Sequence, residues 1–357
     1  MVLVPAAIGV ALVVFAAAAL VLLRVHDSDV TPELPPGDTP AATVGALPPG
    51  RTWLSGAWTG GTIGAARIEA FGTWRGQPSD VVTTYPAYET WDQIADTDWH
   101  IGVLDGFKGR LEYGLPLVPR DHQSSLADVL TGKHDAVFST VAQLLNKHNR
   151  GDSFVRIGLE ANGSWFPWGA DAQTAADFKA AFRHVQAIMK KVSPKLVFLF
   201  DITCGHPLDG SDDRMAPLTA LYPGDDVVNV IGCDHYDATT VKSRNADEWK
   251  KTLRPDTGPG LADVADFARQ HHKGLAVPEW GLQSKAQKGA GDNPYFIYSM
   301  YQFFQQNKDI LVFENYFNEP DDSLGSAIWE KVQNPRSAAE YKKLWGSPPA
   351  LRAKPLA

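Results

Sequence analysis

The sequence predicts an α/β protein, a (β/α)8 TIM barrel preceded by an N-terminal transmembrane helix and a Pro-rich linker. Short apolar runs alternate with longer amphipathic or polar stretches along most of the 357 residues, which is typical of βα units around a parallel sheet. Polar and aromatic residues directly follow the later apolar runs, and a long uncharged segment opens the chain. A single barrel with an added N-terminal segment accounts for this length.

Eight apolar runs are the predicted strands. They are Ile68–Gly72, Val81–Tyr85, His100–Leu104, Phe154–Leu159, Leu196–Phe200, Val227–Gly232, Gly274–Val277 and Ile310–Phe313. Three stretches between them predict helices, at Thr174–Lys191, Gly260–His271 and Asn293–Gln306. The first carries Phe178, Phe182 and Val185 at the spacing of one helical face, and Pro194 follows where the helix must stop.

The N-terminal segment predicts a membrane anchor. No charged side chain occurs in the first 23 residues, and a helix of that length spans roughly 34 Å, enough for a hydrocarbon core of about 30 Å. The segment lacks the basic start of a signal peptide, and it is longer than the apolar region of such a peptide. We therefore expect residues 1–24 to tether the folded domain to a membrane on its extracytoplasmic side. The protein is secreted if the segment is cleaved, and Arg24 alone leaves the orientation open.

The rest of the chain divides into a linker, one domain and a tail. Residues 25–50 contain six prolines and few large apolar groups, so they predict an extended spacer. Residues 51–347 form the predicted barrel domain, and residues 348–357 form a C-terminal tail.

Composition excludes several classes of protein. Hydrophobic residues make up 44% and charged residues 21% of the chain, which rules out global disorder, collagen and coiled coil. A net charge of −8 argues against a nucleic-acid partner. The histidines do not occur at zinc-ligand spacing, so we expect no metal site. No G-x-S-x-G motif is present, which argues against an α/β-hydrolase, and we expect no organic cofactor. Cys204 and Cys233 follow neighbouring strands and can form a disulfide outside the cytosol.

Candidate site residues lie at the carboxyl ends of the predicted strands, where barrel enzymes place their catalytic groups. Residues two apart in a strand share a face. In the fourth predicted strand, Arg156, Gly158 and Glu160 therefore share one face. Val230, Gly232, Asp234 and Tyr236 share a face of the sixth, and Leu275, Val277 and Glu279 share a face of the seventh. The polar members of these sets are expected to face one cavity at the mouth of the barrel.

Glu160 and Glu279 are the candidate catalytic pair. Cleaving a glycosidic bond with retention needs one carboxylic acid to protonate the leaving oxygen and one carboxylate to attack the anomeric carbon. An apolar, Trp-walled setting raises a carboxyl pKa, whereas hydrogen-bond donors lower it. Glu160 beside Trp165 and Trp168 therefore fits the acid/base, and Glu279 with Tyr236 as donor fits the nucleophile.

Three segments resemble glycoside hydrolase family 26, a (β/α)8 family of retaining endo-acting enzymes that includes β-mannanases and some β-glucanases. VRIGLEANGSWFPWG (Val155–Gly169) is similar to the acid/base segment of that family, with matches at Arg156, Glu160, Asn162, Gly163, Trp165 and Trp168. YPGDDVVNVIGCDHYD (Tyr222–Asp237) resembles its sixth-strand segment, and KGLAVPEWG (Lys273–Gly281) resembles its nucleophile segment.

Two positions depart from the family pattern. Leu159 stands where the family usually has a histidine before the acid/base glutamate. No tryptophan marks the eighth strand as a sugar platform, so Phe313, Tyr316 or Phe317 would have to replace it. Both departures leave the substrate open among β-mannan, β-glucan and a related glycan.

We hypothesise a retaining, endo-acting, monomeric glycoside hydrolase that acts on a polysaccharide or oligosaccharide with Glu160 and Glu279. The expected substrate-binding residues are Arg156, Asn162, Trp165, Trp168, Asp201, Asp234, His235, Tyr236, Trp280 and Tyr316. Two alternatives remain open. One is a membrane-anchored carbohydrate-binding barrel without hydrolysis, and the other is a transglycosylase that uses the same glutamate pair.

Overall fold

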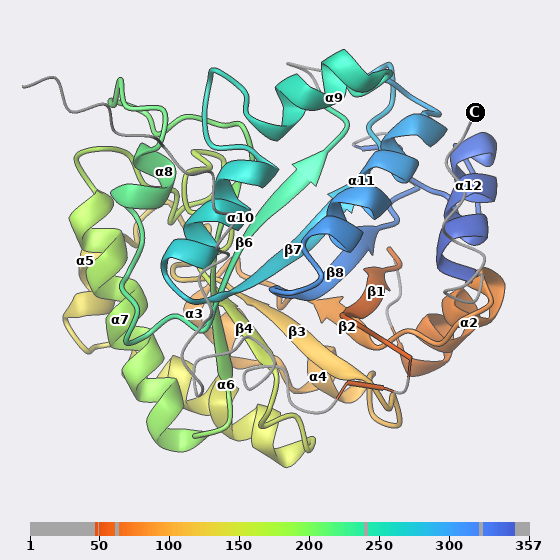
Figure 1. Ribbon diagram of the computed structural model, residues 1–357. Coiled ribbons are helices and arrows are strands. Elements are labelled where there is room, and N and C mark those ends of the chain that lie inside the picture. Colours follow the sequence, from red (N-terminus) through yellow and green to blue (C-terminus); the bar gives the residue numbers. More distant parts are fainter. Residues whose placement is uncertain (1–46, 49, 61–63, 239–241, 321–323, 347–357) are drawn as a thin grey trace, which may run out of the picture. The chain divides into compact units, whose positions relative to one another are not determined.

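Parallel strands close into a barrel in chain order, and β8 pairs with β1 (Figure 1). The computed structural model describes residues 47–48, 50–60, 64–238, 242–320 and 324–346. Within them the strands are β1 Leu54–Trp58, β2 Val81–Thr84, β3 Arg110–Leu115, β4 Phe154–Ile157, β5 Val197–Thr203, β6 Val230–Tyr236, β7 Gly274–Gly281 and β8 Leu311–Phe317. The predicted eight-stranded parallel barrel is confirmed.

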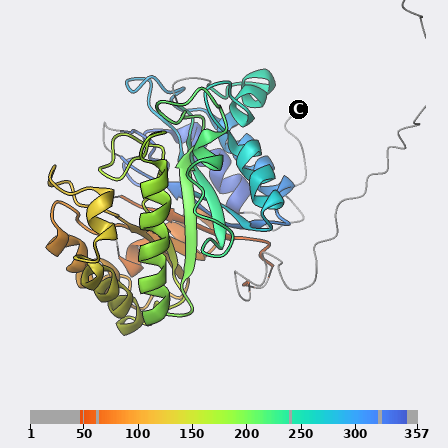
Figure 2. The same ribbon diagram turned by 90° about the vertical axis from the view of Figure 1, so that its left-hand side faces the viewer.

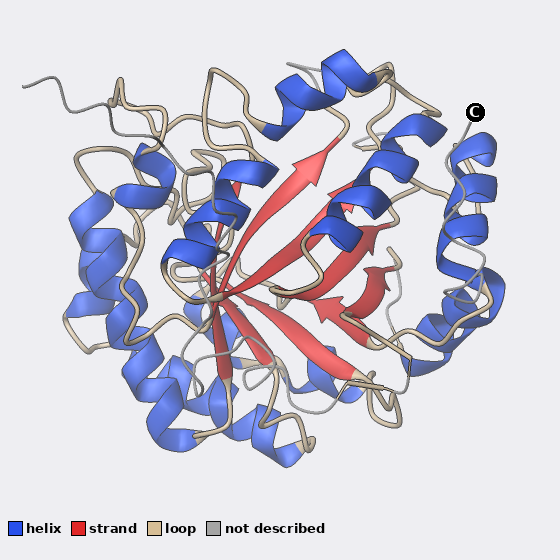
Figure 3. Cartoon of the chain, in the orientation of Figure 1, coloured by secondary structure: helices blue, strands red, loops and turns tan. Residues whose placement is uncertain are grey.

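Helices surround the strands, as the two views in Figures 2 and 3 show. They are α2 Ala65–Arg75, α3 Trp91–Ala95, α4 Asp98–Gly102, α5 Leu126–Leu130, α6 Asp135–Lys147, α7 Ala175–Val192, α8 Ala216–Thr219, α9 Ala246–Leu253, α10 Leu261–Gln270, α11 Pro294–Gln306 and α12 Pro335–Gly346. Helices α7, α10 and α11 match the three predicted helices. On α7 the buried residues include Phe178, Phe182, Val185 and Met189, because apolar side chains at this spacing form one stripe against the barrel.

Two of the eight predicted strands are wrong. Residues 68–72 lie in α2, where the buried positions are Ile68, Phe71, Gly72 and Arg75. Residues 100–104 overlap α4, and Ile101 and Leu104 are buried three positions apart. In both segments the apolar residues follow the period of a helix, and a short apolar run does not by itself distinguish a helix from a strand.

The strands that replace them are β1 and β3, which carry small or polar residues on one face. In β1, a Cβ at Gly56 would lie 1.8 Å from the carbonyl oxygen of Val81, so only glycine fits between these two strands. In β3, Leu111 and Tyr113 pack into the helix-facing core while Glu112 faces the barrel interior. A strand with such an interior face has no continuous apolar run to reveal it.

Apolar residues fill the barrel interior at the amino ends of the strands. This inner cluster comprises Leu54, Val81, Phe154, Val197, Leu199, Val230, Ala276, Val312 and Phe313. A second, larger cluster lies between the strands and the helices. Because the inner cluster closes one end of the barrel, the polar groups farther along the same strands collect at the carboxyl end.

The predicted anchor (1–24), the linker up to residue 46 and the tail lie outside the described residues and stay predictions. In the ranges that the structure describes, no helix combines the length and the apolar character needed to span a bilayer.

Candidate active site

Glu160 reaches the mouth of the barrel through a turn and not through a continued strand. Strand β4 ends at Ile157, and both Gly158 (φ 59°) and Glu160 (φ 49°) adopt left-handed backbone conformations. The expected alternation through Gly158 to Glu160 is therefore wrong. A non-glycine residue in this region costs on the order of 1 kcal/mol. The amide nitrogens of Glu160 and Ala161 donate to Asp201 on β5, at 3.4 Å and 3.1 Å, and hold the turn in place.

A β-bulge on β7 turns Glu279 into the barrel. Leu275 and Val277 pack in the helix-facing core and Ala276 lies in the inner cluster, so the predicted shared face of Leu275, Val277 and Glu279 is also wrong. The pairing of β7 with β8 shifts register between Val277 and Trp280. A bulge inserts one residue and re-aims the side chains that follow it. The side chain of Glu279 consequently faces the interior of the barrel.

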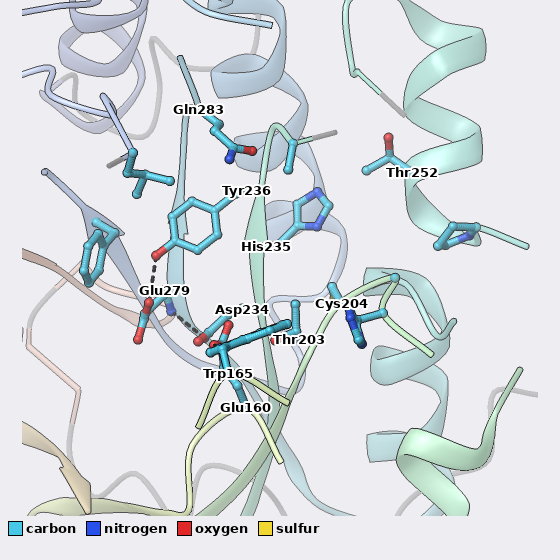
Figure 4. Close-up of a pocket in the computed structure, with 16 residues that line it drawn as sticks. Glu160, Trp165, Thr203, Cys204, Asp234, His235, Tyr236, Thr252, Glu279 and Gln283 are labelled. Carbon is cyan, nitrogen blue, oxygen red and sulfur yellow. Dashed lines mark hydrogen bonds between the residues drawn. The ribbon is translucent and has the colours of Figure 1, made fainter. Parts of the chain in front are cut away.

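Three donors hold the Glu279 carboxylate, and Figure 4 shows one of them, Tyr236. The Tyr85 hydroxyl donates to Oε1 at 2.6 Å and the Tyr236 hydroxyl donates to Oε2 at 2.7 Å. Arg156 Nη1 also donates to Oε1, at 2.7 Å. Hydrogen bonds of this kind stabilise the ionised form and fix the plane of the carboxylate.

Arg156 is the buried cation of the site. It is fully buried and forms ion pairs with Asp201 (2.8 Å), with Glu279 (2.7 Å) and with Asp234. Burial alone would disfavour the charged guanidinium, but the surrounding carboxylates hold the pKa of Arg156 well above its ordinary value. One cation cannot neutralise all three carboxylates, and burial raises the pKa of both Asp201 and Asp234.

Glu160 has a different environment from Glu279. Burial, together with the charge of Glu279, raises the pKa of Glu160 to about 7. Its Oε2 accepts one hydrogen bond from the indole nitrogen of Trp165, at 2.8 Å. A carboxyl group whose pKa is raised in this way can keep its proton near neutral pH, which is the property that a general acid needs.

Both glutamates line one pocket of about 770 Å³. Its walls are formed by Glu160, Trp165, Thr203, Cys204, Gly205, His206, Asp234, His235, Tyr236, Ala238, Thr252, Pro255, Glu279, Gln283, Phe317 and Leu324. No lysine or arginine is among these described lining residues. In the same part of the chain, no group of three or more His, Cys, Asp or Glu side chains is arranged to hold a metal ion.

Six predicted site residues line this pocket: Glu160, Trp165, Asp234, His235, Tyr236 and Glu279. Trp165 is half exposed. His235 packs against Trp249 and Phe296, and burial lowers its pKa to about 4. A neutral imidazole in this wall adds no positive charge to the pocket.

Three predicted aromatic contacts are buried away from the pocket. Trp168 is 1% exposed, stacks on Phe166 and donates to the carbonyl of Leu159. Trp280 directs its indole outward to Glu314. Tyr316 donates to the carbonyl of Ser326. Neighbours of an inward residue in a strand point outward, which explains Trp280 beside Glu279.

Three polar residues that were predicted to bind substrate are buried behind the pocket lining. Arg156 and Asp201 are fully buried beneath the glutamates. Asn162 is 1% exposed, and its side-chain amide bonds the backbone of Thr203 and of His206. These side chains position other groups and are not available to a ligand.

Sequence reasoning missed Tyr85 and the segment after β5. Tyr85 ends a predicted strand, so the rule that catalytic groups follow strand ends could have found it. Gly114 leaves room for it, because a Cβ there would lie 2.5 Å from the Tyr85 ring. Of the three aromatic residues considered as platforms, Phe317 lines the pocket, whereas Phe313 belongs to the inner cluster.

Cys204 and Cys233 form a disulfide, with their Cα atoms 5.3 Å apart. It joins the loop after β5 to the adjacent strand β6. The pairing that the sequence left open is therefore present in the structure.

Comparison with known proteins agrees with the resemblance found in the sequence. The model of glycosyl hydrolase family 26 matches residues 118–275. A mannan endo-1,4-beta-mannosidase of Bifidobacterium adolescentis is 31% identical over 144 residues, which make up 39% of this chain and 14% of that protein. Endoglucanase H of Acetivibrio thermocellus is 25% identical over 297 residues, 82% of this chain and 30% of that protein. The chain thus spans less than a third of the length of either relative.

The fold matches solved structures. A family 26 β-mannanase of Bacteroides ovatus superposes with a TM-score of 0.59 at 16% identity, and the match covers 83% of this chain and 89% of that chain. At 16% identity, this similarity shows a shared fold and nothing more specific.

Proposed function

Because residues 118–275 match glycosyl hydrolase family 26, we propose that this protein is a retaining, endo-acting glycoside hydrolase of a mannan or glucan polysaccharide. Glu160 acts as the acid/base and Glu279 as the nucleophile. The observation that carries the proposal is the presence of both glutamates in one pocket, where the pKa of Glu160 is raised and where Tyr85, Tyr236 and Arg156 donate hydrogen bonds to Glu279. The names of the mannosidase and endoglucanase relatives support these two substrate classes.

The proposed reaction has two steps. In the first, a Glu279 carboxylate oxygen attacks the anomeric carbon while Glu160 donates its proton to the glycosidic oxygen, and the bond to the leaving sugar breaks. In the second, Glu160 accepts a proton from water, and the water oxygen displaces Glu279 from the same carbon. Two inversions retain the anomeric configuration, and both glutamates return to their starting protonation states.

The partners of Glu279 support its role as nucleophile. Tyr85 and Tyr236 hold one carboxylate oxygen each, and Arg156 holds Oε1 from below. The carboxylate is thereby oriented before the substrate arrives, which lowers the entropic cost of attack.

Product analysis with the full chain tests the proposal. β-Mannan, β-glucan and xylan are incubated with the protein, new reducing ends are counted, and the anomer formed first is recorded by NMR. We expect oligosaccharides with retained configuration from mannan or glucan, and no release by Glu279→Ala. Glu69→Ala, at an exposed position outside the pocket, is the matched control. Release of the inverted anomer would contradict the mechanism.

Two further measurements separate this proposal from its alternatives. Binding of a glycan without any Glu279-dependent release would favour a carbohydrate-binding barrel, and longer products in the presence of an added acceptor would favour a transglycosylase. For Glu160→Ala we expect a larger loss on substrates with poor leaving groups than on glycosyl fluorides, because fluoride needs little protonation. Equal losses would contradict the acid role.

We also propose that the domain acts outside the cytosol, as a monomer tethered by residues 1–24 or secreted after their removal. The Cys204–Cys233 disulfide supports an oxidising compartment. Fractionation of cells with and without residues 1–24, followed by light scattering of the purified protein, tests the compartment, the tether and the monomer.

A further inference from the structure

One wall of the pocket is held by a disulfide and by several hydrogen bonds. We define it as the 203–206 wall, after the residues that follow the inner part of β5. The disulfide anchors it to β6, and hydrogen bonds tie it to β6 and to neighbouring loops. They run from Cys204 N to Asp234 O (3.0 Å), from Gly205 N to Pro259 O (2.7 Å), from Thr257 Oγ1 to Gly205 O (2.7 Å) and from Asn162 Nδ2 to His206 O (2.9 Å).

This rigidity suits a binding surface. A preorganised segment loses little conformational entropy when a ligand binds. Gly205 adopts φ 76°, a conformation that favours glycine, and a Cβ there would lie 3.3 Å from Pro255. The backbone of the 203–206 wall is thus fixed by the conformation of Gly205 as well as by the disulfide and the hydrogen bonds.

The wall lies on the acid/base side of the pocket. Trp165 donates to Glu160 and meets the His206 ring edge-on, with ring centroids 5.1 Å apart. On the nucleophile side, Tyr236 bonds Glu279 and packs edge-on against Phe317. The pocket is therefore divided into a half that carries the proton donor and a half that carries the attacking carboxylate.

We propose that the 203–206 wall and Trp165 form the subsite for the leaving-group sugar, and that His206 accepts a hydrogen bond from a hydroxyl of that sugar. The inference rests on the proposed function. The glycosidic oxygen must lie beside Glu160 while the carbon under attack lies beside Glu279. The sugar that departs with this oxygen consequently extends over the half that carries Trp165 and His206.

The side chains of this half define the chemistry of the sugar. His206 Nδ1 lies 3.0 Å from the carbonyl oxygen of Pro207, which can only accept, so this contact favours the tautomer that carries its proton on Nδ1 and offers Nε2 as an acceptor. The half-exposed indole of Trp165 offers an apolar surface to a pyranose. Since the described lining residues include carboxyl groups but no lysine or arginine, the subsite disfavours an anionic sugar.

The test compares two substrates that share the same glycone. One carries an oligosaccharide as leaving group, and the other is the corresponding glycosyl fluoride, which places nothing on the wall. For His206→Ala we expect kcat/KM to fall about tenfold on the oligosaccharide, as for one lost hydrogen bond, and to stay unchanged on the fluoride. His206→Gln, which keeps an acceptor, should recover part of the loss. His272→Asn, at an exposed position, is the control.

Transglycosylation provides a second readout, because an acceptor sugar occupies the leaving-group subsite in the second step. With the fluoride as donor and an added oligosaccharide acceptor, His206→Ala should give a lower ratio of transfer to hydrolysis than the wild type. Equal losses of kcat/KM on both substrates, or no loss on either, would overturn the inference. Fluoride hydrolysis that survives Glu279→Ala would instead overturn the proposed function.

Discussion

Replacing Trp165 by phenylalanine is expected to move the alkaline limb of the pH–activity profile to higher pH. Glu160 must be protonated to act as an acid, and its pKa is raised to about 7 by burial and by the charge of Glu279. Activity should therefore fall as the pH rises through about 7. The Trp165 indole donates to Glu160 Oε2 at 2.8 Å and favours the ionised form. Without this donor, the carboxyl holds its proton to higher pH.

The size of the effect follows from the strength of that bond. A hydrogen bond to a charged group contributes roughly 1.5–3 kcal/mol. Trp165 is 50% exposed, so water replaces part of the interaction and about 1 kcal/mol is a reasonable expectation. At 1.36 kcal/mol per tenfold change in proton affinity, the limb should move upward by about 0.7 pH.

The assay is kcat/KM against pH on an oligosaccharide substrate, since this ratio reports the ionisation of the free enzyme. Trp99→Phe is the matched control, because Trp99 is 58% exposed and lies outside the pocket. A glycosyl fluoride should show a weaker alkaline limb in both proteins. A limb that stays in place or moves to lower pH in Trp165→Phe would refute the assigned role of the indole.

Three other changes have expected outcomes. Tyr236→Phe removes one donor to Glu279, and steady-state kinetics should show kcat about 10- to 100-fold lower with a smaller change in KM; a change in KM alone would contradict this. Reduction of Cys204–Cys233, with a sequence separation of 29, should lower the free energy of unfolding by about 3–4 kcal/mol, as measured by denaturant titration with and without reductant. Burial raises the pKa of Glu314 to about 7, so its contribution to stability is present below its unfolded-state pKa of about 4.3 and is lost as the pH rises through 7. Denaturant midpoints of Glu314→Gln should lack that part of the pH dependence, and identical profiles for both proteins would exclude it.

Local sequence patterns were enough to predict the barrel and its two glutamates. Strand-length apolar runs separated by helical stretches predicted the parallel barrel, because the period of burial along the chain is a local property. Glu160 and Glu279 were found because each lies within a characteristic segment at a strand end. The same local reasoning failed at residues 68–72 and 100–104, where a few apolar residues fit either period.

Which side chains face the pocket depends on contacts that form when the chain folds. Two local departures from regular strands, the left-handed turn at Glu160 and the bulge before Glu279, set the direction of both carboxyl groups. Tyr85 and His206 belong to the site because segments that are distant in the sequence meet at the barrel mouth. Trp280 lies outside the site because its side chain points to the opposite face of β7. Side-chain direction depends on register and on contacts between strands, and these arise only when the chain closes into a barrel.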